Sequence, residues 1–184
     1  MNARVTFTPK PDKLADSILY LALKGIELDQ YLTVKLLYLA DREHLRRFGR
    51  PITFDKYVAM PFGPVGSAAY DWLRSKTALG INPADLPFKI KKLDKFYFVS
   101  EPRREIDRSI FSKSDLMVLD QTAEKYGNMT FKQLYDLTHD HFAYDRAWKN
   151  KKSKADEMRF EDFLIEDASK DDRVSDLAFT SKGM

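Results

Sequence analysis

Apolar residues recur at helical spacing along most of the chain. The spacing of Leu14, Ile18 and Leu21 predicts an amphipathic helix, because residues three and four apart share one helix face. Asp12 can cap this helix and Gly25 can end it. The pattern therefore favours a helix-rich fold.

The next predicted helix has clear ends, with Asp29 as its N-cap and Gly49 as its C-terminal stop. At about 100° per residue, apolar side chains cover most of its circumference, so we expect neighbours on several sides. What remains is a narrow polar stripe that we expect to face solvent. The stripe consists of Tyr31, Lys35, Tyr38, Arg42 and Arg46.

Residues 51–100 show a different pattern. Prolines at 51, 61 and 64 predict a structured connector, and Pro64 suits the first turn of a third helix that runs to about Lys76. The segments FKIKK and FYFVS, separated by a short turn, predict a β-hairpin from Phe88 to Ser100. We expect one small antiparallel unit here.

Two capping boxes predict further helices. Ser112 with Asp115 opens a helix that ends at Gly127, and Thr130 with Gln133 opens the helix FKQLYDLTHDHF. We expect these two helices to form a helical hairpin.

The chain becomes charged and poor in aliphatic residues after residue 150. Residues 151–184 are interpreted as a charged C-terminal extension with at most one short helix, around Phe160 to Ala168. The predicted fold class is mainly α. It is a single compact helical domain over residues 1–150, with a small antiparallel β-hairpin and this extension.

Composition narrows the functional classes. A chain of 184 residues with 43% hydrophobic residues fits one domain with a real core. The absence of cysteine excludes disulfides, thiol nucleophiles and zinc sites with thiolate ligands. No apolar run is long enough to span a bilayer and the N-terminal residues lack the apolar stretch of a signal peptide, so we expect a cytoplasmic protein.

The sequence contains no motif that indicates catalysis. His139 and His141 are about 200° apart on a helix and cannot jointly face one metal ion, and His44 lies in a charged helical end. The chain has no Gly-x-Ser-x-Gly elbow, no phosphate loop, and no spaced pair of carboxylates in an apolar setting. We therefore predict a protein that is not an enzyme, with no catalytic residues, metal or cofactor.

Two groups of residues are candidates for binding a partner. The polar stripe combines tyrosine and arginine, which are enriched at interface hot spots, although a solvated helix face is the alternative. The basic, aromatic hairpin can bind nucleic acid or an acidic protein, or its lysines can simply discourage edge pairing. The candidate partner-binding residues are Tyr31, Lys35, Tyr38, Arg42, Arg46, Lys89, Lys91 and Tyr97.

The run from Lys35 to Val65 carries a recognisable set of motifs. They are K-L-x-Y-x-x-D ending at Asp41, then G-x-P-I, aromatic-x-Ala and G-P-V. In this order and spacing they resemble the signature of the Panacea domain, the SocA-like antitoxin family also described as phage-associated GepA-like proteins. The signature residues Asp41, Gly49, Pro51, Tyr57, Ala59, Gly63, Pro64 and Val65 are interpreted as structural, with Asp41 anchoring backbone N–H groups of the connector.

The resemblance implies a mainly helical domain with a small β element. It also implies an antitoxin of a toxin–antitoxin system that neutralises a co-encoded toxin by direct protein–protein binding. The expected partner is the cognate toxin protein; nucleic acid is not favoured, no membrane is expected, and no oligomeric state is indicated. The alternatives are a nucleic-acid-associated regulator that uses the basic hairpin and a proteolytic adaptor for the toxin.

Overall fold

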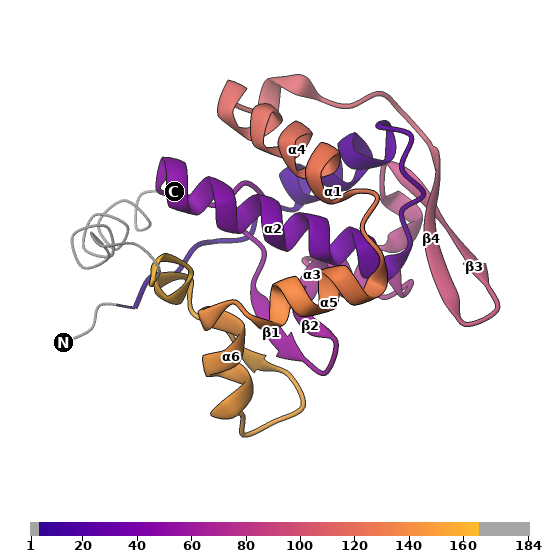
Figure 1. Ribbon diagram of the computed structural model, residues 1–184. Coiled ribbons are helices and arrows are strands. Elements are labelled where there is room, and N and C mark those ends of the chain that lie inside the picture. Colours follow the sequence, from indigo (N-terminus) through magenta and orange to yellow (C-terminus); the bar gives the residue numbers. More distant parts are fainter. Residues whose placement is uncertain (1–3, 166–184) are drawn as a thin grey trace.

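Helix α2 (Gln30–Phe48) is the element around which the others pack (Figure 1). The structure is a computed structural model, and it describes residues 4–165. Asp29 accepts a hydrogen bond from the N–H of Leu32 at 2.7 Å, and Gly49 ends the helix with a left-handed φ of 75°. Both ends of α2 therefore form as the sequence predicts.

The described residues form five further α-helices. They are α1 (Pro11–Ala22), α3 (Ser67–Leu73), α4 (Lys113–Tyr126), α5 (Phe131–His139) and α6 (Phe142–Lys149), with short 3₁₀ helices η1 (Pro83–Asp85), η2 (Arg108–Ile110) and η3 (Phe160–Leu164). Both predicted capping boxes form, at Ser112 and at Thr130. The helices that they open, α4 and α5, each pack against α2.

Three local predictions about the helices are wrong. Helix α1 begins at Pro11, whose fixed φ suits a first helical position, so Asp12 lies in the first turn and does not cap it. The third helix begins at Ser67, because Pro64 lies in a strand. The helix predicted through residue 142 is interrupted after His139, and α6 starts at Phe142.

The strands form two antiparallel sheets. One has the order β2-β1-β5 and contains β1 (Tyr57–Met60), β2 (Gly63–Gly66) and β5 (Asp156–Glu157). The other is the predicted hairpin, β3 (Phe88–Leu93) with β4 (Phe96–Pro102), which extends from one side of the helices (Figure 1).

The prediction of a mainly α fold with one hairpin is therefore wrong, and the structure is a mixed α/β fold. The prediction failed because the prolines of residues 51–66 were taken to indicate a connector without strands. Pro64 pairs with Ala59 in β2, an edge strand of its sheet. An edge strand tolerates proline because it leaves a row of N–H groups unused. Strands of four residues also give too short an alternation to be distinguished from a loop.

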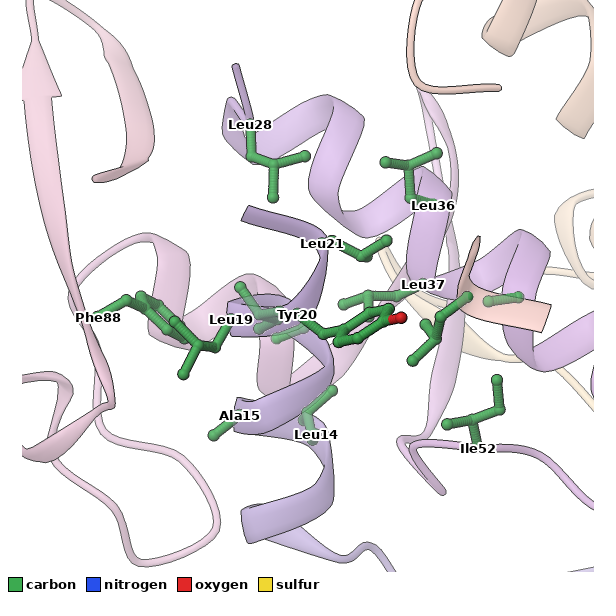
Figure 2. Packing of buried hydrophobic residues seen from close by; sticks show 14 of the residues in the cluster. Leu14, Ala15, Leu19, Tyr20, Leu21, Leu28, Leu36, Leu37, Ile52 and Phe88 are labelled. Atoms are coloured by element: carbon green, nitrogen blue, oxygen red, sulfur yellow. The ribbon is translucent and has the colours of Figure 1, made fainter. Parts of the chain in front are cut away.

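Two large hydrophobic clusters lie on different sides of α2. The first joins side chains of α1, α2, α3, α4 and β3, and Figure 2 shows part of it, with Leu14, Leu37 and Phe88 among its members. The second contains Tyr38 and Leu39 of α2 and aromatic residues from β1, α6 and η3. Helix α2 is therefore shared by both clusters.

Residues 156–165 pack onto the earlier part of the chain. Strand β5 pairs with β1, and Phe163 and Leu164 of η3 are buried. The short helix expected around Phe160 to Ala168 is a 3₁₀ helix over Phe160–Leu164, and residues 166–168 lie outside the described residues. The domain boundary at residue 150 stays a prediction.

Candidate functional site

The stripe of α2 that we expected to face solvent is covered. Lys35 and Tyr38 are completely buried, and Tyr31, Arg42 and Arg46 are partly buried. The prediction of a solvated stripe is therefore wrong. Strand β2, helix α5 and η3 all pack against α2, and helical periodicity cannot show which face such elements will cover.

Lys35 reaches from α2 to the β1–β2 hairpin. Its Nζ donates a hydrogen bond to the carbonyl oxygen of Pro64 at 2.8 Å and lies 4.9 Å from the centre of the Tyr31 ring. Burial lowers the pKa of Lys35 from its ordinary 10.5 to about 7, because the charged form loses its hydration. A protonated amine has three donors, and Pro64 supplies the one acceptor found among the described residues. Lys35 can therefore donate to a further acceptor.

Gly63 makes the approach of Lys35 possible. Its φ of 103° lies in the region that strains any residue with a side chain. A Cβ at this position would stand 2.9 Å from Lys35 Nζ and 2.9 Å from Thr138 Oγ1. A glycine is therefore required here by both the backbone conformation and the space beside Lys35.

A cavity of about 270 Å³ lies beside Lys35, between α2, the β1–β2 hairpin and α3. Val34, Met60 and Val65 contribute apolar side chains to its lining. Two of its lining residues are basic, Lys35 and Arg74, and none is acidic. The cavity is therefore an apolar space with a positive charge bias.

Three aromatic side chains lie beside this cavity, and we call them the aromatic rim: Tyr31, which is partly buried, and Phe62 and Phe131, which are exposed. Phe62, in the β1–β2 turn, is 61% exposed, and Phe131, at the start of α5, is 52% exposed. Their ring centres are 6.0 Å apart, and those of Tyr31 and Phe131 are 4.4 Å apart. The rim is therefore a continuous apolar surface.

Tyr38 and Arg46 serve the second hydrophobic cluster. The Tyr38 hydroxyl lies 3.0 Å from Nδ1 of His141, and its ring packs edge-on against Tyr57 and Phe163. Arg46 donates to the carbonyl oxygen of Phe163 at 3.2 Å. Tyr38 and Arg46, two candidates for partner binding, therefore hold η3 and the β1–β2 hairpin on α2.

Arg42 lines a second cavity, of about 520 Å³, between α2 and α4. Glu43, Lys125 and His141 also line it, so both signs of charge face the space. Within residues 4–165, no three side chains of the types that bind metal ions come together. This cavity offers no arrangement of groups that points to one kind of ligand.

The candidate residues of the β3–β4 hairpin lie at the surface. Lys89 forms an ion pair with Glu101 at 2.5 Å, and Lys91 is exposed. Tyr97 is half-buried, and the Arg74 guanidinium lies 5.4 Å from its ring centre. Arg74 therefore connects the hairpin to the cavity beside Lys35.

Asp41 has the anchoring role that the sequence suggested. Its Oδ1 accepts hydrogen bonds from the N–H groups of Ile52 and Thr53, at 2.8 and 2.9 Å. Its Oδ2 accepts from the hydroxyl of Tyr57 at 2.7 Å and from that of Thr53. Burial raises the pKa of Asp41, in opposition to these hydrogen bonds. Asp41 and Tyr57 therefore fix the connector to α2.

The other signature residues also occupy structural positions. Gly49 terminates α2, Pro51 and Ala59 are buried, and Pro64 supplies the carbonyl that Lys35 binds. Val65 packs in a small third cluster of the core.

Asp55 is a structural residue that sequence reasoning missed. Its carboxylate accepts hydrogen bonds from the N–H groups of Ala68 and Ala69, each at 3.1 Å, and so caps α3 from outside the helix. Burial raises its pKa to about 6, and these backbone hydrogen bonds oppose that effect. No local signal predicts it, because it lies more than a dozen residues before the groups it binds.

A buried ion-pair cluster around Asp115 was likewise not foreseen. Asp115 pairs with Lys13 Nζ at 2.6 Å and with the Arg50 guanidinium at 2.9 Å. Burial alone would raise the pKa of Asp115, but the hydrogen bonds from Arg50 and Lys13 hold it below its ordinary value. His44 donates from Nδ1 to the carbonyl of Arg50, and burial lowers its pKa. The cluster ties α1 and the end of α2 to the start of α4.

The comparisons identify the family of the chain. No helix within residues 4–165 has both the length and the apolar content needed to cross a membrane. A family model described as antitoxin SocA-like, Panacea domain, matches residues 34–149. The chain therefore belongs to the SocA-like antitoxin, Panacea domain family, as the motifs between Lys35 and Val65 indicated. No curated protein and no solved structure matches the chain.

Proposed function

We propose that this protein is a non-enzymatic antitoxin that neutralises a co-encoded toxin by binding it directly. The observation that carries the proposal is the family match over residues 34–149, from α2 to the end of α6. Exposed aromatic side chains beside the cavity at Lys35 support a binding role, because such side chains contribute much of the energy of protein interfaces.

The experiment is to purify the product of the adjacent toxin gene and mix it with this protein at micromolar concentrations. We expect the two to co-elute as one complex and the toxin to lose its activity in proportion to the complex formed. Separate elution, with the toxin fully active, would refute the proposal.

The β3–β4 hairpin favours a second candidate, a regulator that binds nucleic acid. Leu93 and Phe96 are exposed at its tip, and Lys91, Lys92 and Lys95 lie beside them. Binding through phosphates weakens steeply as salt rises, because counterions are released on binding. Retention on DNA or RNA with a steep salt response would favour this candidate, and its absence would remove it.

A proteolytic adaptor is the remaining alternative. An adaptor accelerates loss of the toxin when a protease is present, whereas a blocking antitoxin lowers toxin activity with no protease at all. Comparing toxin amount with toxin activity, with and without purified housekeeping proteases, separates the two.

A further inference from the structure

The amine of Lys35 has hydrogen-bond donors that its contact with Pro64 does not use. Lys35 is buried from solvent, yet one carbonyl at 2.8 Å is the hydrogen-bond acceptor that residues 4–165 supply to its Nζ. Buried amines are normally satisfied, because an unmade hydrogen bond to a charged group is costly. Lys35 also lines the cavity, so a group that enters the cavity can supply a further acceptor.

The charge of the lining selects the incoming group. Lys35 and Arg74 are its two basic residues, and no lining residue is acidic. An incoming carboxylate would stabilise the charged form of Lys35 and accept the unused hydrogen bonds, and in a site shielded from water such a pair is stronger than at the surface.

The size and surroundings of the cavity favour a protein side chain over a metabolite. Its volume of about 270 Å³ lies just below the range of roughly 300–1,000 Å³ typical of small-molecule sites. The exposed Phe62 and Phe131 beside it provide an apolar surface that a single small anion would leave uncovered. A polypeptide that places an acidic residue beside an apolar one fits both the cavity and the aromatic rim.

We propose that this cavity receives an acidic side chain of the partner polypeptide, whose carboxylate accepts a hydrogen bond from Lys35 Nζ while neighbouring apolar residues of the partner cover the aromatic rim. The proposal rests on the proposed function, since it assigns the chemistry by which the antitoxin holds its toxin.

The first test measures proton uptake when the complex forms. Isothermal titration of this protein with the purified product of the adjacent toxin gene is carried out at pH 8 in buffers of different ionisation enthalpy. Lys35 is mostly neutral at this pH, because its pKa is about 7. A carboxylate beside Nζ returns Lys35 to its charged form, so we expect an uptake approaching one proton per complex. Lys35→Met, which keeps the length but removes the charge, abolishes this uptake and weakens binding at least 30-fold.

A second pair of variants tests the proposal even if Lys35→Met does not fold. Phe62→Ala removes an exposed side chain of the aromatic rim, and we expect at least tenfold weaker binding. Phe48→Ala is the matched control, because Phe48 is 43% exposed at the opposite end of α2, and it leaves binding unchanged.

The outcomes separate this inference from the proposed function. If the wild-type protein forms no complex, the proposed function fails and this inference fails with it. If a complex forms without proton uptake and with the same affinity in Lys35→Met and Phe62→Ala, the antitoxin function stands and the carboxylate site is wrong. If millimolar acetate or phosphate alone raises the pKa of Lys35, as followed by NMR of its Nζ, the cavity is a small-anion site and the polypeptide assignment is overturned.

Discussion

A lysine as deeply buried as Lys35 reduces the free energy of unfolding at neutral pH, because a single carbonyl replaces the hydration of its ammonium group only in part. Burial lowers the pKa of the amine to about 7, so its neutral form is populated near neutral pH. An anion bound beside Nζ would offset this loss of stability.

Lys35→Met should therefore raise the free energy of unfolding, by about 3 kcal/mol below pH 7. The folded pKa of Lys35 lies below the unfolded value of 10.5, so between these pH values the unfolded chain binds more protons. The wild-type protein consequently gains stability as the pH rises from about 7 towards 10.5, and the advantage of the variant shrinks. Urea unfolding of both proteins at pH 6, 8 and 9.5 measures this difference. A gap that stays constant with pH contradicts the expected titration.

Asp41 stabilises the connector through four accepted hydrogen bonds, two of them from backbone N–H groups. Asp41→Ala leaves these donors buried without an acceptor, and we expect a loss of about 3 kcal/mol or more in the free energy of unfolding. Asp136→Ala is the control, because Asp136 is exposed and its ion pair with Lys132 contributes little. Equal effects of the two substitutions in urea unfolding would show that Asp41 is no anchor.

Among the elements, η3 is a single short 3₁₀ helix, yet all five of its residues are buried. Its Phe163 lies 5.5 Å from the ring centre of Tyr38 and 5.9 Å from that of Tyr57. It therefore covers the part of α2 that the sequence pattern left open to solvent. The packing of η3 shows that residues 160–164 belong to the hydrophobic core.

Phe163→Ala should lower the free energy of unfolding by roughly 3–5 kcal/mol, because it removes a buried ring from the second cluster and leaves a cavity. Phe96→Ala makes the same chemical change at a position that is 47% exposed, and it should have an effect below about 1 kcal/mol. The comparison by urea unfolding needs no partner. A small effect of Phe163→Ala would mean that η3 is not part of the cooperative core.

For the whole molecule, the position of α2 between the two large clusters predicts a single cooperative unfolding transition. The fluorescence of the two tryptophans reports on different clusters, since Trp72 is buried in the first cluster and Trp148 packs against the second. In the variants Trp72→Phe and Trp148→Phe, the remaining tryptophan should give the same fluorescence midpoint as circular dichroism of the same variant. Separate midpoints in either variant would show that the clusters unfold independently.

The sequence alone determined the features that depend on near neighbours in the chain. The ends of α2, the capping boxes at Ser112 and Thr130 and the β3–β4 hairpin all form as predicted, because each depends on residues a few positions apart. The motifs between Lys35 and Val65 likewise indicated the family that the comparison gave.

Tertiary structure decided everything that depends on distant segments. Whether Lys35 and Tyr38 face water is determined by β2, α5 and η3, which follow them by tens of residues. The aromatic rim, of which only Tyr31 was a candidate, exists because the β1–β2 turn and the start of α5 meet beside α2. Periodicity describes one element in isolation, whereas burial, and the pKa of a buried amine with it, depends on which other elements cover that face.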